Sequence, residues 1–139
     1  MGKVVMQKYN SYISNLTILS TAKEQDLMNE FIISGIIAKY SIQFTFTWKL
    51  LKELLQYEGI QIADSATPRE IIKAAYAIYD FIEEEAWLSM LRARNNMTHI
   101  YDGTAAKELV NIILQQYIPA FVVLKEGIEE RYGRILQEL

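Results

Sequence analysis

The stretch "NEFIISGIIAKYSIQFTFTWKLLKELLQYE", residues 29–58, decides the fold. Its apolar side chains recur every three or four residues, which is the period of an amphipathic helix. The main stripe consists of Ile33, Ile37, Tyr40, Phe44, Trp48, Leu51 and Leu55, and it is widened by Ile36, Phe46, Leu50 and Leu54. An apolar surface of this width predicts packing on more than one neighbour. A helix of about 28 residues, roughly 42 Å long, would form the spine of the domain, with Gly59 as its C-terminal stop.

The segments on either side also carry helical patterns. From residue 4 to about residue 25, the apolar positions Val5, Tyr9, Tyr12, Ile13, Leu16 and Leu19 predict an amphipathic helix. After the spine, Thr67, Pro68 and Glu70 form a capping-box signature, which predicts a helix from Pro68 to about residue 79.

Two more helices are predicted in the second half of the chain. Asp80 and Glu83 repeat the capping-box spacing before "EEEAWLSMLRARN", so the run of residues 83–85 should lie in a first turn, where negative charge favours the helix dipole. Residues 104 to about 139 are again helical in pattern, and Pro119 should kink or split that helix. The fold class is therefore all-α, with about five helices.

Length and composition limit the number of domains and the kinds of functional site that the chain can form. A chain of 139 residues with 51% hydrophobic content is expected to form one domain, residues 1–139, with a real core. The absence of cysteine excludes disulfides, thiolate nucleophiles and cysteine zinc sites, and a single histidine excludes a multi-histidine metal site within one chain. A magnesium or manganese site built of carboxylates stays open, although no cofactor is predicted. The net charge of −3 argues against a protein that coats nucleic acid non-specifically.

No targeting segment is evident in the sequence. The N-terminus "MGKVVMQKYNSY" lacks a continuous apolar core, and the apolar runs "FIISGIIA" and "YIPAFVVL" are much shorter than a membrane span. We therefore expect no membrane association and a cytoplasmic location.

The stretch "LRARNNMTHIYD", residues 91–102, gathers the residues that could carry chemistry. In one continuous helix Arg94 and His99 would lie about 140° apart around the axis, so they can converge only if the helix ends between them. Asn95 and Asn96 tolerate turn geometry. The sequence therefore predicts that Arg94 lies in the last turn of a helix and that His99 follows on the bend or the next element.

These groups suit a phosphodiester. A guanidinium offers a planar fork of donors to phosphate oxygens, an imidazole exchanges a proton near neutral pH, and Asn95 could orient either group. Metal-independent RNA cleavage needs both a base and an acid, and a two-fold dimer would supply a second histidine. The alternative is structural, because an arginine at a helix C-terminus meets the helix dipole favourably and a lone histidine often caps a helix junction.

Other aromatic and charged residues receive simpler interpretations. Trp48, Trp87, Phe44, Phe46, Tyr40 and Tyr57 are expected in the core or at a dimer interface. Lys49 and Lys52 should be solvated, or else line a groove for an acidic ligand. Arg69 and Arg92 are further candidates for binding phosphate.

Several motifs together resemble a known family. "RNNMTHIYD" resembles the Arg-x4-6-His signature of the HEPN superfamily (higher eukaryotes and prokaryotes nucleotide-binding). "FTFTWKLLKELLQYEGI", "TPREIIKAAY", "WLSMLRARNNMTHIYD" and "YIPAF" occur in the order typical of the nucleotidyltransferase substrate-binding protein family, and the resemblance covers residues from about 40 to 124.

The resemblance implies an up-and-down helical bundle that forms a homodimer and works with a minimal nucleotidyltransferase. In related toxin–antitoxin pairs the HEPN protein is a ribonuclease, which the nucleotidyltransferase silences by adding AMP to a tyrosine just after the histidine. Arg94 and His99 match the catalytic pair of that signature, and Tyr101 matches the modified tyrosine. The alternative is a non-catalytic module that presents a nucleotide or other substrate to the transferase. The chain has no transferase motif of its own.

Overall fold

The computed structural model describes residues 2–97 and 102–137, and every regular element in these ranges is helical. The elements are α1 (Gly2–Leu19), the short 3-10 helix η1 (Ala22–Glu24), α2 (Glu30–Tyr57), α3 (Pro68–Ile78), α4 (Glu84–Asn95), α5 (Gly103–Ile112), the π-helical turn η3 (Ile113–Tyr117) and α6 (Ile118–Gln137). The prediction of an all-α fold is confirmed.

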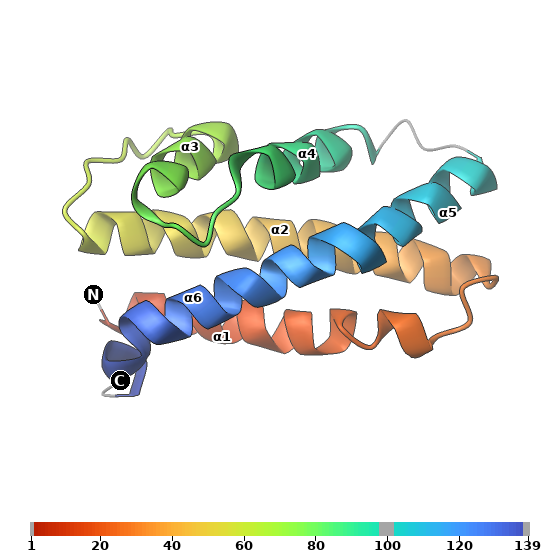
Figure 1. Cartoon of the computed structure of the whole chain (residues 1–139), viewed down its shortest axis with the longest axis horizontal. Helices are drawn as coiled ribbons and strands as arrows, with labels where there is room; N and C mark the ends of the chain where they lie inside the picture. The colour runs from red at the N-terminus through yellow and green to blue at the C-terminus, as the bar shows by residue number, and fades with distance from the viewer. Residues whose placement is uncertain (1, 98–101, 138–139) are drawn as a thin grey trace.

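The helices run up and down along one long axis (Figure 1). α1 and α2 lie antiparallel, and α3 followed by α4 returns along the other side of α2. α5, η3 and α6 then form one rod that crosses the bundle diagonally and ends near the N-terminus. Taken with this rod as a single unit, the described part of the chain forms about five helices, as predicted.

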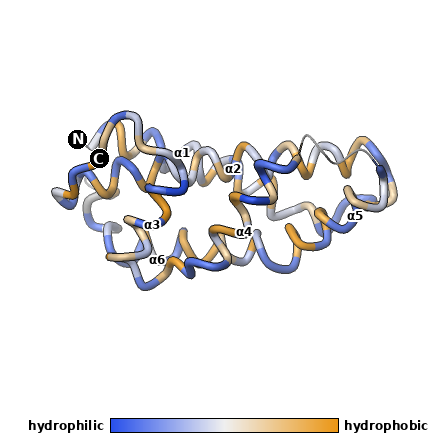
Figure 2. The backbone as a smooth tube through the Cα atoms, turned by 90° about the horizontal axis from the view of Figure 1, so that it is seen from above, coloured by the Kyte–Doolittle hydropathy of each residue, from blue (hydrophilic) through white to orange (hydrophobic). Residues whose placement is uncertain are grey.

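α2 is the spine that the sequence predicts, with its bounds at Glu30 and Tyr57. Its start is capped by the Asn29 side chain, which accepts hydrogen bonds from the amides of Phe31 and Ile32. It stops before Gly59, whose φ of 82° lies in the left-handed region that glycine adopts without strain. Hydrophobic and hydrophilic segments alternate along the helices, as expected when each helix buries one face (Figure 2).

Two predicted helix boundaries are wrong. The first helix ends at Leu19 rather than near residue 25, and the chain continues as a bend and the short η1 turn. α3 begins with the predicted capping box of Thr67 and Glu70, but the repeat of that spacing at Asp80 does not cap α4. Glu83 occupies the N-cap position of α4 without a side-chain cap bond, and Asp80 lies in a turn with Phe81 between the two helices. Glu84 and Glu85 do lie in the first turn.

The last helix is interrupted next to Pro119, in line with the prediction of a kink or split there. The interruption takes the form of the π-helical turn η3, in which the Ile118 amide donates to the carbonyl of Ile113, five residues back. This wider turn directly precedes Pro119, so the loss of the proline amide donor is absorbed by a change of hydrogen-bonding pattern.

Aromatic rings from four helices meet at the centre of the core. Phe121 of α6 is fully buried and contacts the rings of Tyr12, Tyr40 and Trp87, with centroid distances of 6.5, 6.3 and 5.5 Å. The prediction that Trp87 is a core residue is therefore confirmed. Tyr57, by contrast, is 42% exposed in the last turn of α2, and its ring meets that of Tyr132 of α6 edge-on at 6.1 Å.

The core also contains polar side chains that the apolar pattern does not reveal. Asn15 of α1 donates to Gln43 Oε1 of α2 at 2.8 Å, and Gln43 donates back to the Tyr12 carbonyl at 3.1 Å. Thr47 donates to the Gln43 carbonyl at 2.7 Å. Because these buried groups have partners, they fix the register of α1 on α2 at little desolvation cost.

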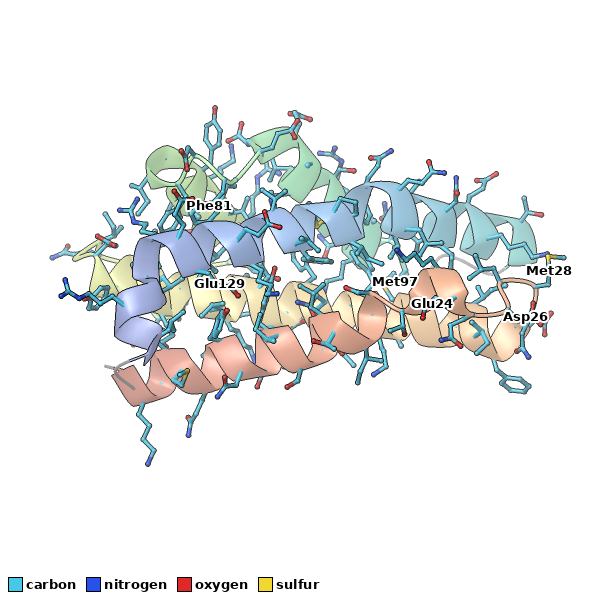
Figure 3. The ribbon with its side chains drawn as sticks, turned by 60° about the horizontal axis from the view of Figure 1, so that its bottom comes forward. Glu24, Asp26, Met28, Phe81, Met97 and Glu129 are labelled. Carbon is cyan, nitrogen blue, oxygen red and sulfur yellow. The ribbon has the colours of Figure 1, made fainter. Side chains whose placement is uncertain are left out.

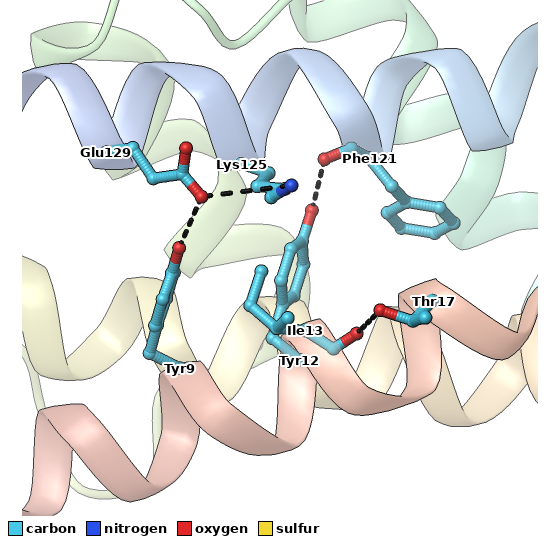
Figure 4. Close-up of polar contacts among 7 residues, drawn as sticks. All are labelled: Tyr9, Tyr12, Ile13, Thr17, Phe121, Lys125 and Glu129. Carbon is cyan, nitrogen blue, oxygen red and sulfur yellow. Dashed lines mark hydrogen bonds and ion pairs between the residues drawn. The ribbon is translucent and has the colours of Figure 1, made fainter. Parts of the chain in front are cut away.

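Tyrosine hydroxyls attach α6 to the rest of the bundle. Tyr9 donates to Glu129 at 2.7 Å, and Lys125 lies 3.9 Å from the same carboxylate (Figure 4). The Tyr12 hydroxyl donates to the Phe121 carbonyl at 2.5 Å (Figure 4). At the far end of α6, Tyr132 donates to Glu58 at 2.7 Å.

These contacts predict a loss of stability in alkaline solution. Burial raises the pKa of Tyr9, Tyr12, Tyr40, Tyr79 and Tyr132 above the ordinary value of about 10. Above about pH 10 the unfolded chain releases phenol protons that the folded chain retains, so the free energy of unfolding should fall, by up to about 1.4 kcal/mol per pH unit for each such tyrosine. Urea unfolding at about pH 8 and about pH 11 measures this. Tyr132→Phe should show a shallower decline, and a decline that begins only well above pH 11 would contradict the prediction.

Candidate functional site

Arg94 occupies a position on α4 where the helical pattern calls for an apolar side chain. It follows Trp87 by seven residues and Leu91 by three, so it lies on the same face of the helix as these two core residues. That face packs on α2, and the arginine is therefore held against α2 and only half-buried.

The guanidinium has two contacts on α2. Its Nη2 donates to Thr45 Oγ1 at 2.9 Å, and the Thr45 hydroxyl in turn donates to the Ser41 carbonyl at 3.1 Å. Its Cζ lies 5.7 Å from the centroid of the Phe44 ring, within the range of a cation–π contact. Hydroxyl and ring together fix the plane of the guanidinium.

The Arg94 charge is left uncompensated by these contacts. Within the described residues its Nε is buried without a hydrogen-bond partner, and no carboxylate forms an ion pair with it. A half-buried cation attracts an anion more strongly than a solvated one, because water competes less for it. Arg94 is thus suited to hold a phosphate or a carboxylate.

Trp48 and Lys49 extend this surface along α2. Trp48 follows Thr45 by three residues and lies on the same side of the helix; its indole Nε1 is buried with no described partner. The Lys49 Nζ lies 5.8 Å from the centroid of the Trp48 ring. Trp48 is half-buried rather than enclosed in the core, and Lys49 is exposed as expected.

α4 ends at Asn95, and the Asn96 amide caps it by donating to the Arg92 and Arg94 carbonyls. The prediction that Arg94 lies in the last turn, with the helix ending before His99, is confirmed. His99 and Tyr101 themselves lie outside the described residues. The chain is described again from Asp102, whose side chain caps α5 by accepting from the Ala105 amide at 2.7 Å.

Comparison with known protein families identifies the family of the chain. Residues 5–130, most of its length, match the family described as "Nucleotidyltransferase substrate binding protein like". The chain belongs to this family. Among curated proteins, no significant match to the sequence was found.

The other predicted site residues stand apart from Arg94. Arg92 is two residues before it and therefore points about 200° away around α4, into solvent. Arg69 is exposed in the first turn of α3, and α3 and α4 lie one after the other along α2 (Figure 1). Asn95 is exposed, and its side chain has no hydrogen bond to another described residue. Neither Arg69 nor Arg92 is brought to the Arg94 guanidinium.

The sequence interpretation missed the two residues that position Arg94. Phe44 was assigned to the core without a link to the site, and Thr45 was not singled out. The available signal was the break in the apolar stripe of α4, because a buried arginine needs a polar partner on the facing helix.

The described ranges 2–97 and 102–137 contain neither a metal-binding cluster nor a membrane-spanning helix. No group of three or more histidine, cysteine, aspartate or glutamate side chains is arranged to hold a metal ion there. None of the helices there has the length and apolar character that a membrane crossing requires.

Proposed function

We propose that the chain acts as the partner of a minimal nucleotidyltransferase and is itself a HEPN-type, metal-independent endoribonuclease. The observation that carries the proposal is the Arg94 guanidinium, which is half-buried, oriented by Thr45 and Phe44, and left without a counter-charge. In this proposal it binds the scissile phosphate.

The remaining chemistry falls to the end of α4 and the segment that follows it. His99 would take the proton of the ribose 2′-hydroxyl or give one to the leaving 5′-oxygen, and Asn95 would orient the reacting groups. One histidine per chain cannot perform both steps at once, so the proposed site is composite, with two chains in a homodimer each contributing Arg94 and His99.

The test is cleavage of single-stranded RNA by the purified protein in EDTA. The proposal expects products with 2′,3′-cyclic phosphate ends, because attack by the 2′-hydroxyl expels the 5′-oxygen without water or metal. Intact RNA after prolonged incubation, with the protein folded by circular dichroism, would overturn it.

Regulation by the partner is expected at Tyr101. Incubation with the nucleotidyltransferase and ATP should add the mass of one AMP group to the chain and suppress RNA cleavage. Tyr101→Phe should abolish the mass increase and leave cleavage active in the presence of the partner. A mass increase that persists in Tyr101→Phe would place the modification on another residue.

A second candidate function is supported by the family description, which refers to substrate binding rather than hydrolysis. In that case the chain presents a nucleotide or other substrate to the transferase, and Arg94 holds its phosphate without cleavage. Complex formation with the partner, combined with intact RNA and no toxicity on expression, would favour this function.

A further inference from the structure

A groove with acidic walls lies at the opposite end of α4 from Arg94. It is made of two adjoining hollows of about 520 and 500 Å³, lined by the chain that connects α3 to α4, the first half of α4, η3 and α6. Phe81 and Val123 line both hollows and therefore join them into one continuous acidic groove.

The floor of the acidic groove is apolar and held in place. The Phe81 ring stacks on Tyr79 with a centroid distance of 4.8 Å and an interplanar angle of 23°. It also lies directly against Gly127, where an added Cβ would approach its ring to 2.3 Å, so only glycine lets α6 come this close. Figure 3 shows Phe81 beside α6. Val123 is 49% exposed, and Pro119 and Ala120 continue the apolar surface.

The charged side chains of the walls are predominantly acidic. Five exposed carboxylates line the two hollows: Asp80, Glu83, Glu85, Glu126 and Glu130. None of them forms an ion pair with a described residue. The one cation in the lining, Arg131, is engaged by Glu58, with its Nε 3.5 Å from Oε1, and lies over the Tyr79 ring at 5.0 Å.

The acidic walls and the apolar floor together restrict which kind of ligand the groove can bind. A metal ion does not fit, because the described carboxylates form no cluster that could hold one. RNA is repelled by the uncompensated negative charge. A polypeptide segment with lysine or arginine side chains around an apolar residue is complementary to both the walls and the floor.

We propose that the acidic groove docks a basic segment of the nucleotidyltransferase, with an apolar side chain of that segment seated on Phe81 and Val123. The inference rests on the proposed partnership but not on RNA cleavage. It assigns the two ends of α4 different partners: the arginine end faces phosphate, and the glutamate end faces a basic protein segment.

The experiment measures binding of the full chain to the nucleotidyltransferase encoded in the same genome, by interferometry at low and high salt. The double variant Glu83→Lys/Glu126→Lys should raise the Kd at least tenfold and remove most of its salt dependence. The matched control Asp64→Lys/Glu108→Lys makes the same change in net charge at exposed positions outside the groove, and its Kd should stay within twofold.

Val123→Asp separates docking from general attraction. It makes the groove more acidic but places a charge on the apolar floor, so docking predicts weaker binding, whereas a purely long-range attraction predicts tighter binding. Wild-type affinity in the groove double variant, or tighter binding by Val123→Asp, would overturn the groove as the docking site.

The RNA assay keeps the two proposals apart. The groove variants should cleave RNA as the unmodified chain does, because they leave Arg94 and His99 unchanged. If neither the unmodified chain nor any variant cleaves RNA, while binding to the nucleotidyltransferase still depends on the groove, only the ribonuclease assignment is overturned. No binding by the unmodified chain would overturn both the partnership and the groove proposal.

Discussion

His99→Ala is expected to lower the rate of RNA cleavage in EDTA by about 10²- to 10⁴-fold, the usual contribution of a positioned general acid or base. The residual rate should no longer depend on pH near neutrality, because the titrating imidazole is gone. The measurement is single-turnover cleavage of a labelled RNA across the neutral pH range. Full activity in His99→Ala would exclude this histidine from the chemistry.

Variants of Arg94 can be compared in the same RNA cleavage assay. Arg94→Ala should weaken cleavage to a similar degree, and Arg94→Lys should not restore it, because a lysine cannot present a planar fork while bonded to Thr45. Arg92→Ala is the control, since Arg92 belongs to the same helix turn but points into solvent. Equal losses in Arg92→Ala and Arg94→Ala would show that general positive charge, rather than the held guanidinium, drives cleavage.

Phe121→Ala is expected to destabilise the fold by about 3–5 kcal/mol, as is typical when a fully buried phenylalanine is truncated. Phe121 is 0% exposed and joins the rings of α1, α2 and α4 to α6, so its loss opens a cavity that no single helix can close. A total stability of about 5–15 kcal/mol is usual for a domain, so much of it would be lost. The measurement is the free energy of unfolding in urea.

Phe31→Ala is the control for that measurement. Phe31 is 89% exposed in the first turn of α2, and its truncation should change the unfolding free energy by less than about 0.5 kcal/mol. A cost below about 1 kcal/mol for Phe121→Ala would mean that the aromatic centre does not hold the four helices together.

The helix α2 shows which features the apolar spacing of a sequence can predict. Its bounds, its capping glycine and most of its buried positions follow from the sequence, because apolar spacing and end signals act within one helix. Gln43 and Thr47 are buried although the pattern does not predict it. Gln43 is bonded to Asn15 and Tyr12 of α1, which the spacing within α2 cannot reveal.

Pro119 and Asp80 carry sequence signals whose structural outcome depends on residues elsewhere in the chain. A proline in a helix must be accommodated, but the form of the accommodation, a π-helical turn that keeps the rod continuous, depends on the packing of α5 on α2 and of α6 on α1. The capping-box spacing at Asp80 does not start α4: Asp80 and Phe81 form a turn, in which the Phe81 ring stacks on Tyr79 and lies against Gly127.

The sequence by itself determined the all-α class, the spine, the capping box of α3 and the end of α4 before His99, since each depends on residues close together in the chain. Only the tertiary structure decided that Arg94 is held by Thr45 and Phe44 without a counter-charge, and that α6 and the α3–α4 connection enclose an acidic groove. The physical reason is that burial and unpaired charge are properties of the space between helices. Residues far apart in the chain fill that space, and their meeting is fixed by packing rather than by local propensity.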